Sequence, residues 1–365
     1  MRADAGYIAQ ALVLAERGRG TTSPNPMVGA VVVNGEGVVV GRGAHAFAGG
    51  PHAEVLALAD AGPQARGATL YCTLEPCSHT GRTGPCAPRV VAAGIRRVVL
   101  SMQDPNPLVS GAGIALLRAQ GLAVTVGVLE AEARRLNAPF LTAIESGRPH
   151  VTMKAALSAD SKVALAGSRP VRLTGEVANR RVHRDRAEVD AIVVGSGTLL
   201  LDDPLLTARG AYRGRPLARV ILDRRLRSPP TARVLSTIAS GPVIIVTCGP
   251  ETAGREARIS ALSQAGATVY RVPDDLPGFE AAALRHLATR GVTSVMLEGG
   301  PTVHAAFWDR GLVDRVQMYV VPRALGREAV AWWSTSDAVR ERLHAVRSTP
   351  LGPDLLIEGD VHRVD

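Results

Sequence analysis

The sequence predicts two α/β domains joined near residue 148. The chain has 365 residues, of which 46% are hydrophobic, and this is more than one typical core accommodates. Short apolar runs of strand length alternate with helical periodicities in both halves, the pattern of layered α/β folds. A helical segment over 130–146 is followed by Gly-Arg-Pro, which ends it. We therefore expect domains over 1–147 and 148–365.

The composition excludes several classes of protein. No apolar run approaches the roughly 18 residues of a membrane span, and the N-terminus is amphipathic rather than an apolar signal segment. We expect a cytoplasmic protein without membrane contact. Four cysteines are too few for a disulfide framework. The net charge of +9 is scattered and aromatic residues make up 3% of the chain, which favours anionic small ligands over nucleic acid.

The first half reads as alternating helices and strands. Ile8, Leu12 and Ala15 have helical spacing and predict a helix over 5–17. Asn34-Gly35 predicts a hairpin between strands at 30–33 and 38–40. Further predicted strands lie at 68–72, 97–101 and 123–126, and further helices at 52–59, 86–93 and 114–119.

The second half repeats this alternation. Strands are predicted at 151–155, 191–194, 219–222, 243–247, 268–272, 294–297 and 315–320, with a helix at 303–310. Glycine-rich turns follow two of these strands, at 195–198 and 298–302. Backbone amides at such turns cradle phosphates, but neither turn is Gly-x-Gly-x-x-Gly, so an ordinary tight turn is the alternative. Arg186, Asp202 and Arg209 are predicted in polar loops facing the same cleft, or else as solvated surface.

His52, Cys77 and Cys86 form a candidate metal site. One imidazole and two thiols fill three corners of a tetrahedral zinc site and leave the fourth for water. Glu54, two residues after the histidine, is free to move protons. Eight residues separate the cysteines, more than in the usual nucleoside-deaminase signature, but two glycines and a proline allow the segment to fold back. A structural zinc finger is the alternative.

The sequence leaves the roles of two further polar residues, His79 and Asn25, open. His79 is either a fourth metal ligand or a substrate contact, and Glu54 favours the second because a closed site would not use it. Asn25 lies between two prolines before the first strand. Its amide either faces a ligand from an extended backbone or only shapes the turn.

Five segments together resemble the bifunctional deaminase-reductase family of riboflavin biosynthesis. These segments are 25–29, 52–54, 75–86, 202–207 and 298–302. The resemblance covers both halves, and the wide cysteine spacing is specific to this branch of the zinc deaminases. It implies a cytidine-deaminase-like α/β/α layered domain followed by a dihydrofolate-reductase-like α/β domain.

The resemblance implies roles for the first-domain motifs. The implied zinc ligands are His52, Cys77 and Cys86. Glu54 is implied as the proton shuttle, and Asn25 and His79 as contacts to the pyrimidine and its ribose phosphate. The implied substrate is the 2,5-diamino-6-(phosphoribosylamino)pyrimidinone, which is deaminated to its aminouracil counterpart.

In the second domain the resemblance implies NADPH-dependent reduction of the ribosyl group to ribityl. The implied cofactor contacts are Lys154, Ala156, Arg172, Thr198, Asp202, Gly299, Gly300, Pro301, Thr302 and Val303. The implied substrate contacts are Pro170, Arg186, Leu206, Arg209 and Glu298. The resemblance also implies a homo-oligomer, either a dimer or a tetramer.

The reductase half departs from the family pattern at two places. Where Ser-x-Trp-Ile-Thr is common, residues 170–174 read Pro-Val-Arg-Leu-Thr, so a hydroxyl and an indole are missing. Ser161 follows Asp160 where Asp-Gly is usual. The alternatives are therefore a deaminase with a degenerate reductase domain, a deaminase of nucleic-acid bases, or a zinc-stabilised scaffold without chemistry. The missing aromatic residues and Glu54 disfavour the last two.

Overall fold

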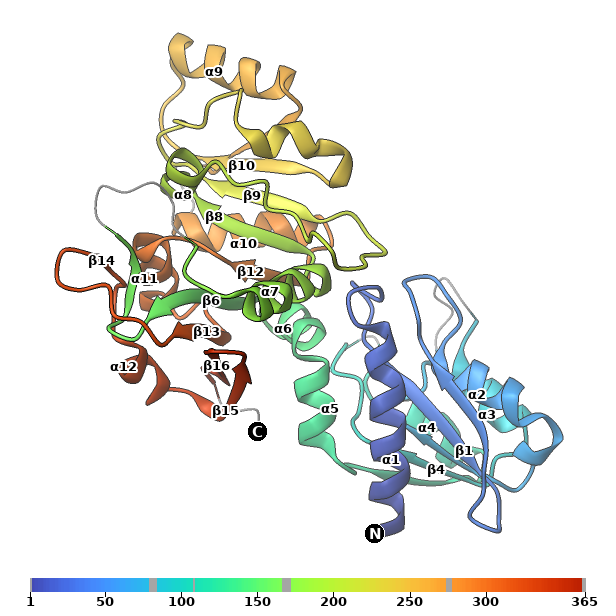
Figure 1. Cartoon of the computed structure of the whole chain (residues 1–365). Coiled ribbons are helices and arrows are strands. Elements are labelled where there is room, and N and C mark those ends of the chain that lie inside the picture. Colours follow the sequence, from blue (N-terminus) through green and yellow to red (C-terminus); the bar gives the residue numbers. More distant parts are fainter. Residues whose placement is uncertain (1, 79–83, 108, 166–171, 274–277, 363–365) are drawn as a thin grey trace. The chain divides into compact units, whose positions relative to one another are not determined.

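The computed structural model describes residues 2–78, 84–107, 109–165, 172–273 and 278–362 (Figure 1). Backbone contacts divide the chain into two compact units, 1–147 and 148–363. Each unit has its own sheet. Within these described ranges, no helix combines the length and the apolar composition needed to cross a bilayer.

The first unit is built on a five-stranded mixed sheet of order β2-β1-β3-β4-β5. Its strands are β1 Gly29–Val33, β2 Val39–Ala44, β3 Thr69–Cys72, β4 Arg97–Leu100 and β5 Ala123–Val126. Strand β1 is antiparallel to both of its neighbours, while β3, β4 and β5 are parallel. Its helices are α1 Arg2–Ala15, η1 Glu16–Gly18, α2 Ala53–Ala61, η2 Gly62–Ala65, α3 Cys86–Ala92, α4 Ala112–Ala119, α5 Glu130–Leu136 and α6 Ala138–Ser146.

Helices cover both faces of this sheet. Side chains of α2, α3 and α4 pack on one face, in a cluster that includes Ala57, Val90 and Leu117. Helix α1 packs Ile8 and Leu14 on the opposite face. The α/β/α layering predicted for the first domain is confirmed.

A glycine fixes the approach of α2 to the sheet edge. A Cβ atom at Gly43 in β2 would lie 2.0 Å from the carbonyl oxygen of Ala53. Any larger residue would push α2 away from the strand, because this neighbour is backbone. The first turn of α2 contains Glu54, so this close contact helps to place a predicted catalytic side chain.

The second unit is built on a nine-stranded sheet of order β11-β10-β9-β8-β12-β6-β13-β16-β15. The first seven strands of this order, from β11 through β13, are parallel to one another. Strands β16 and β15 extend the sheet as an antiparallel hairpin. The strand bounds are β6 His150–Ser158, β8 Ala191–Gly195, β9 Ala218–Leu222, β10 Val243–Thr247, β11 Ala267–Arg271, β12 Ser294–Leu297, β13 Arg315–Val321, β15 His344–Leu351 and β16 Asp354–Asp360. A separate two-stranded sheet pairs β7 Lys162–Ala164 with β14 Val330–Ala331.

Helices lie on both faces of the large sheet as well. Their bounds are α7 Glu176–Glu188, α8 Ser196–Asp202, η3 Arg233–Ser240, α9 Ala253–Gln264, α10 Phe279–Thr289, α11 Pro301–Asp309 and α12 Ser336–Arg340. Side chains of α10 and α11 join one core cluster, and those of η3 and α9 join another. The layered α/β architecture predicted for the second half is confirmed.

Two predicted local structures are wrong. The single helix over 130–146 is two helices, α5 and α6, with a break at Asn137. Pro139 cannot donate within a continuous helix, and the Asn137 amide instead bonds both backbone groups of Met27, at 2.7 and 3.0 Å. The loop predicted for Arg186 and Asp202 is also wrong, because Arg186 lies within α7 and Asp202 is the last residue of α8. The polar face of a helix carries many charges and resembles a loop in composition.

The Asp160–Ser161 departure forms an anchored turn. Ser161 has a φ of 57°, a left-handed conformation that favours glycine. Its side-chain oxygen accepts a hydrogen bond from the Ser336 backbone at 2.9 Å, and its carbonyl accepts one from Trp332 at 3.0 Å. Asp160 accepts bonds from the amides of Leu325 and Gly326. These contacts offset the strain of placing serine there.

Candidate functional site

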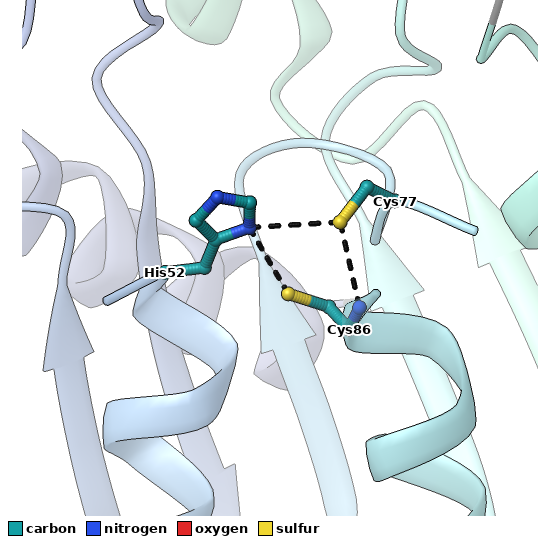
Figure 2. Close-up of side chains that lie close together, drawn as sticks. All are labelled: His52, Cys77 and Cys86. Atoms are coloured by element: carbon teal, nitrogen blue, oxygen red, sulfur yellow. Dashed lines mark hydrogen bonds between the residues drawn. The ribbon is translucent and has the colours of Figure 1, made fainter. Parts of the chain in front are cut away.

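Three ligand-type side chains converge in the first unit (Figure 2). His52 precedes α2, Cys77 follows β3, and Cys86 opens α3. The His52 Nδ1 atom lies 3.1 Å from the Cys86 Sγ atom and 3.6 Å from the Cys77 Sγ atom. All three ligand atoms lie within 4.8 Å of one another. An imidazole and two thiols are a donor set that suits zinc, and three ligands leave one tetrahedral position open.

Glu54 lies in the first turn of α2 and is 4% exposed. Burial raises the pKa of its carboxyl group, while the neighbouring His52 acts in the opposite direction. A raised pKa makes the carboxylate a stronger base, which suits a group that takes a proton and then returns it. Glu54 is therefore suited to proton transfer beside the three convergent ligands.

Asn25 and His45 border this cluster. The Asn25 Nδ2 atom lies 3.2 Å from the His45 Nε2 atom, and the His45 Nδ1 atom lies 3.0 Å from the Pro51 carbonyl oxygen. Since a carbonyl only accepts, the His45 Nδ1 atom carries the proton and the Nε2 atom accepts from Asn25. Burial lowers the pKa of His45, which keeps the ring neutral. The rings of His45 and His52 meet edge to face, with centroids 5.6 Å apart.

Sequence reasoning missed His45. It is 3% exposed and lies seven residues before His52 in the same loop, but a single histidine in a glycine-rich segment carries no motif of its own. His79, the other residue predicted to bind the substrate, lies outside the described residues.

Glu75 anchors the segment that carries the first cysteine. It is 3% exposed and accepts hydrogen bonds from the backbone amides of Asp104, Gly111 and Ile114, at 2.9 to 3.1 Å. These bonds tie the end of β3 to the loop before α4 and to its first turn. Glu75 therefore fixes the position of Cys77 without reaching the ligand cluster itself.

A Glu75→Gln substitution should weaken zinc binding. The amide group cannot accept all three bonds, so we expect a loss of about 1–3 kcal/mol of unfolding free energy. Loss of a group that hydrogen-bonds to a metal ligand weakens metal affinity by about 10- to 100-fold, and Glu75, which supports Cys77 only through the backbone, should have an effect near the lower value. Chelator competition and thermal unfolding measure the two effects. Glu130→Gln, at an exposed carboxylate of the same unit, is the control and should match the unmodified protein; equal zinc affinity in both variants would contradict the assignment.

The second unit contains a pocket of about 750 Å³ at the carboxyl ends of its parallel strands. Many residues with predicted cofactor or substrate roles line it: Lys154, Ala156, Arg186, Thr198, Asp202, Leu206, Glu298, Gly299, Gly300, Pro301, Thr302 and Val303. Arg172 and Arg209 are exposed and do not line this pocket. Pro170 lies outside the described residues.

Two glycine turns meet at the pocket wall. Gly195 ends β8, and Gly299 lies between β12 and α11. A Cβ atom at either glycine would lie 2.6 to 2.8 Å from a side-chain carbon of Val303. The glycines therefore allow close packing of the two turns, which leaves the start of α11 at the pocket. A helix start beside a bare backbone turn is suited to binding phosphate.

A buried ionic group lies in the same pocket. The Arg186 guanidinium donates to both oxygens of Glu298, at 2.6 and 2.7 Å, and the Lys154 Nζ atom lies 3.9 Å from Glu298. The three side chains are 15%, 8% and 14% exposed. Burial raises the pKa of Glu298, but Arg186 and, more weakly, Lys154 outweigh it and hold the pKa at about 2. Burial lowers the pKa of Lys154.

Three arginines in the pocket wall were missed in the sequence. Arg224, Arg225 and Arg227 follow β9 and line the pocket. Arg224 donates to Glu280 at 2.8 Å, and Arg227 donates to Ser196 at 2.9 Å. One sequence feature could have identified them: the three arginines come directly after a buried strand, and ligands bind at the carboxyl ends of parallel strands.

Two family models match the chain. Residues 1–102 match the cytidine and deoxycytidylate deaminase zinc-binding region, and residues 149–357 match the RibD C-terminal domain. The riboflavin biosynthesis protein RibD of Aquifex aeolicus is 40% identical over 359 residues, 97% of each chain. That of Escherichia coli is 40% identical and 89% of each chain is covered.

Solved structures are similar over nearly the whole chain. Acinetobacter baumannii RibD has a TM-score of 0.85 and 35% identity, and the match covers 98% of this chain and 99% of that chain. A Thermotoga maritima diaminohydroxyphosphoribosylaminopyrimidine deaminase/5-amino-6-(5-phosphoribosylamino)uracil reductase has a TM-score of 0.83 and 33% identity, with the same coverage.

Proposed function

The chain belongs to the RibD family of bifunctional deaminase-reductases of riboflavin biosynthesis, and we propose that its two units divide these activities. Residues 1–147 form the zinc-dependent deaminase, and residues 148–365 form the NADPH-dependent reductase. The first unit has the cytidine-deaminase-like fold and the second the dihydrofolate-reductase-like fold. We also propose a cytoplasmic location, on the sequence pattern of the chain, and a homo-oligomeric state, on the family resemblance.

His52, Cys77 and Cys86 are the proposed zinc ligands. The convergence of their ligand atoms within 4.8 Å, beside the buried Glu54, is the observation that supports deamination in this unit. Bound zinc would activate a water molecule for attack on the ring carbon that carries the amino group. Glu54 would take a proton from that water and pass it to the ring nitrogen and then to the departing ammonia.

Asn25 and His79 are the proposed contacts to the pyrimidine and its ribose phosphate. His45 supports this arrangement as a positioning residue, because it fixes the Asn25 amide through one ring nitrogen while the other is held by the Pro51 carbonyl. The substrate would be the phosphoribosylated diaminopyrimidinone, and the product its uracil counterpart. This product is then the substrate of the second unit.

Reduction in the second unit converts the ribosyl group to ribityl. A hydride adds to the sugar carbon bonded to nitrogen, the bond from that carbon to the ring oxygen breaks, and the ring oxygen takes a proton. Bound NADPH would supply the hydride. We assign the proton to Lys154, because its ammonium lies in the pocket next to the Arg186–Glu298 pair. Arg186, Leu206 and Glu298 would hold the substrate.

The cofactor would lie along the glycine turns and the arginines after β9. The proposed contacts are Ala156, Thr198, Asp202, Gly299, Gly300, Pro301, Thr302 and Val303, all lining the pocket. A dinucleotide with an additional phosphate matches a wall with three arginines, since guanidinium groups bind phosphate through paired hydrogen bonds. Arg225 is the best candidate for that phosphate, because Arg224 and Arg227 already bond to protein groups.

An Arg225→Gln variant should discriminate less between NADPH and NADH. Losing one charge-assisted contact to phosphate costs about 1.5–3 kcal/mol, so the KM for NADPH should rise about tenfold or more. The KM for NADH, which lacks that phosphate, should change less than about twofold. Steady-state reductase assays with both cofactors measure this. Arg285→Gln on the exposed side of α10 is the matched control, and an equal rise for both cofactors would contradict the phosphate contact.

Three measurements on the purified chain test the proposed function together. Zinc content should approach one per chain, ammonia should be released from the diaminopyrimidinone substrate, and NADPH should be oxidised only when the deaminated product is present. Ammonia release without NADPH oxidation would identify a deaminase with a degenerate reductase domain. Zinc binding without either activity would identify a structural metal site.

A further inference from the structure

A buried hydroxyl–carboxylate pair lies beside Lys154. Tyr319 of β13 is fully buried, and its hydroxyl donates to the Asp185 Oδ2 atom at 2.5 Å. Asp185 lies on α7, is 6% exposed, and accepts a second bond at its Oδ1 atom from Arg181, at 2.7 Å. The roles proposed above use Lys154, Arg186 and Glu298 but leave this pair without a function.

The sheet register brings the tyrosine ring to the lysine. In the parallel pairing of β6 with β13, Lys154 is opposite Gln317, and Tyr319 is two residues further along β13. Residues two apart on a strand share a face, so both side chains point to the same side of the sheet. The Lys154 Nζ atom lies 5.6 Å from the centre of the Tyr319 ring, within the range of a cation–π contact.

Helix α7 lies against this face of the sheet (Figure 1) and supplies the carboxylate. Ala178 and Val182 of α7 form a small buried cluster with Tyr319. Asp185 follows one turn after Arg181 on the same helix, and the next residue, Arg186, holds Glu298 from the pocket side. One turn of α7 therefore presents both a group that contacts the pocket and a group that holds the tyrosine.

The charges around Lys154 act in opposite directions. Those facing it are Glu298, Arg186, Asp185 and His304. Burial lowers the pKa of Lys154 and Arg186 lowers it further, whereas Glu298 and Asp185 raise it. Arg186 already binds both oxygens of Glu298, so Glu298 is shared between two cations. Asp185 is therefore a second source of negative charge for the lysine.

The tyrosine keeps Asp185 in place as an acceptor. Burial raises the pKa of Tyr319 well above its ordinary value, so the phenol stays neutral and donates its proton to the carboxylate. The hydroxyl and the Arg181 guanidinium each occupy one oxygen of Asp185. This arrangement fixes the ring plane over which the ammonium lies.

We propose that Tyr319 and Asp185 are positioning residues for Lys154, which hold its ammonium in the pocket and keep it protonated for transfer to the ring oxygen of the substrate. This inference rests on the proposed role of Lys154 as the proton donor. Neither Tyr319 nor Asp185 lines the pocket, so both act through the lysine. Their loss should change the pH range in which the reductase works more than it changes cofactor binding.

The test compares pH profiles of the full-length zinc-loaded chain. In Asp185→Asn and in Tyr319→Leu, the alkaline limb of kcat for substrate-dependent NADPH oxidation should move to lower pH by about one unit, because an ammonium that loses a nearby negative charge or its aromatic face gives up its proton more readily. Tyr319→Phe keeps the ring and should show a smaller shift. The KM for NADPH should stay within about twofold, and ammonia release by the deaminase unit should be unchanged.

A second readout does not depend on turnover. The rate at which a small acylating reagent modifies Lys154, followed by mass spectrometry from pH 6 to 11 without substrate, reports the fraction of free amine. Its midpoint should move with the kinetic limb in Asp185→Asn and Tyr319→Phe, which should both fold because their shapes are conserved. Unshifted midpoints and limbs in both variants would overturn the inference. A Lys154→Met variant that keeps its kcat would instead overturn the proton-donor role itself.

Discussion

A Glu54→Gln variant should lose about 10²- to 10⁴-fold of its deaminase rate while it keeps its zinc. The amide has nearly the shape of the carboxyl group but cannot accept and return a proton, and each ammonia released requires both steps. Zinc should stay bound because the proposed ligand atoms come from His52, Cys77 and Cys86. Ammonia release and zinc stoichiometry, measured on the same sample, separate the two effects.

Internal controls make this experiment decisive. The reductase unit has its own core and sheet, so NADPH oxidation with the deaminated product should remain within about twofold of the unmodified chain. Glu36→Gln changes an exposed carboxyl group of the same unit and should leave ammonia release unchanged. Full deaminase activity in Glu54→Gln with normal zinc content would exclude Glu54 as the proton carrier.

Local periodicity predicted the layered fold, but it underestimated strands that contain glycine or face solvent. The Asn34-Gly35 hairpin is present, and the Asn34 side chain accepts bonds from the amides of Glu36 and Val38. Strand β2 extends further than predicted, to Ala44. A glycine such as Gly43 usually indicates the end of a strand, but here it allows α2 to pack closely against β2. Strand β15 is an edge strand with exposed residues along most of its length, so its sequence has no apolar alternation to detect.

The two sites differ in how much of them the sequence contains. The convergence of His52, Cys77 and Cys86 could be predicted, because the chemistry of zinc restricts the residue types and the three residues lie within one stretch of chain. His45 and Arg225 have no comparable motif, and only the fold brings them to their sites. Arg172 and Arg209 illustrate the opposite case: their contacts were predicted from family positions alone, neither is among the residues that line the pocket, and both contacts stay predictions.

Removal of Arg186 should strongly destabilise the reductase unit. The Arg186→Met variant leaves the Glu298 carboxylate buried with Lys154 at 3.9 Å as its nearest cation. Removing one partner of a buried ion pair costs about 3–5 kcal/mol of unfolding free energy. Lys154 still offsets part of the Glu298 charge, so the loss should lie near the lower value. For a unit of this size that corresponds to a fall of about 6–12 °C in its melting temperature. Calorimetry should show this in the reductase transition alone.

The pH dependence of stability gives a signature of the same pair. The pKa of Glu298 is lowered from its ordinary value of 4.5 to about 2, so its charge stabilises the fold fully above about pH 4.5. That contribution is lost as the pH falls towards 2, since the carboxyl group is then protonated in both states. Arg186→Met should therefore lose less stability than the unmodified chain on acidification over this range.

Replacing both partners separates stability from catalysis. An Arg186→Met/Glu298→Leu variant buries no unpaired carboxylate, so it should recover part of the unfolding free energy lost in the single variant. The recovery should be incomplete, because Lys154 also loses Glu298 as its partner. Its reductase activity should stay as low as in Arg186→Met, because the groups proposed to hold the substrate are absent, while ammonia release continues. A double variant that is no more stable than the single one would contradict the unpaired charge as the cause. Recovered reductase activity would instead show that the ionic pair is structural and that substrate is bound elsewhere in the pocket.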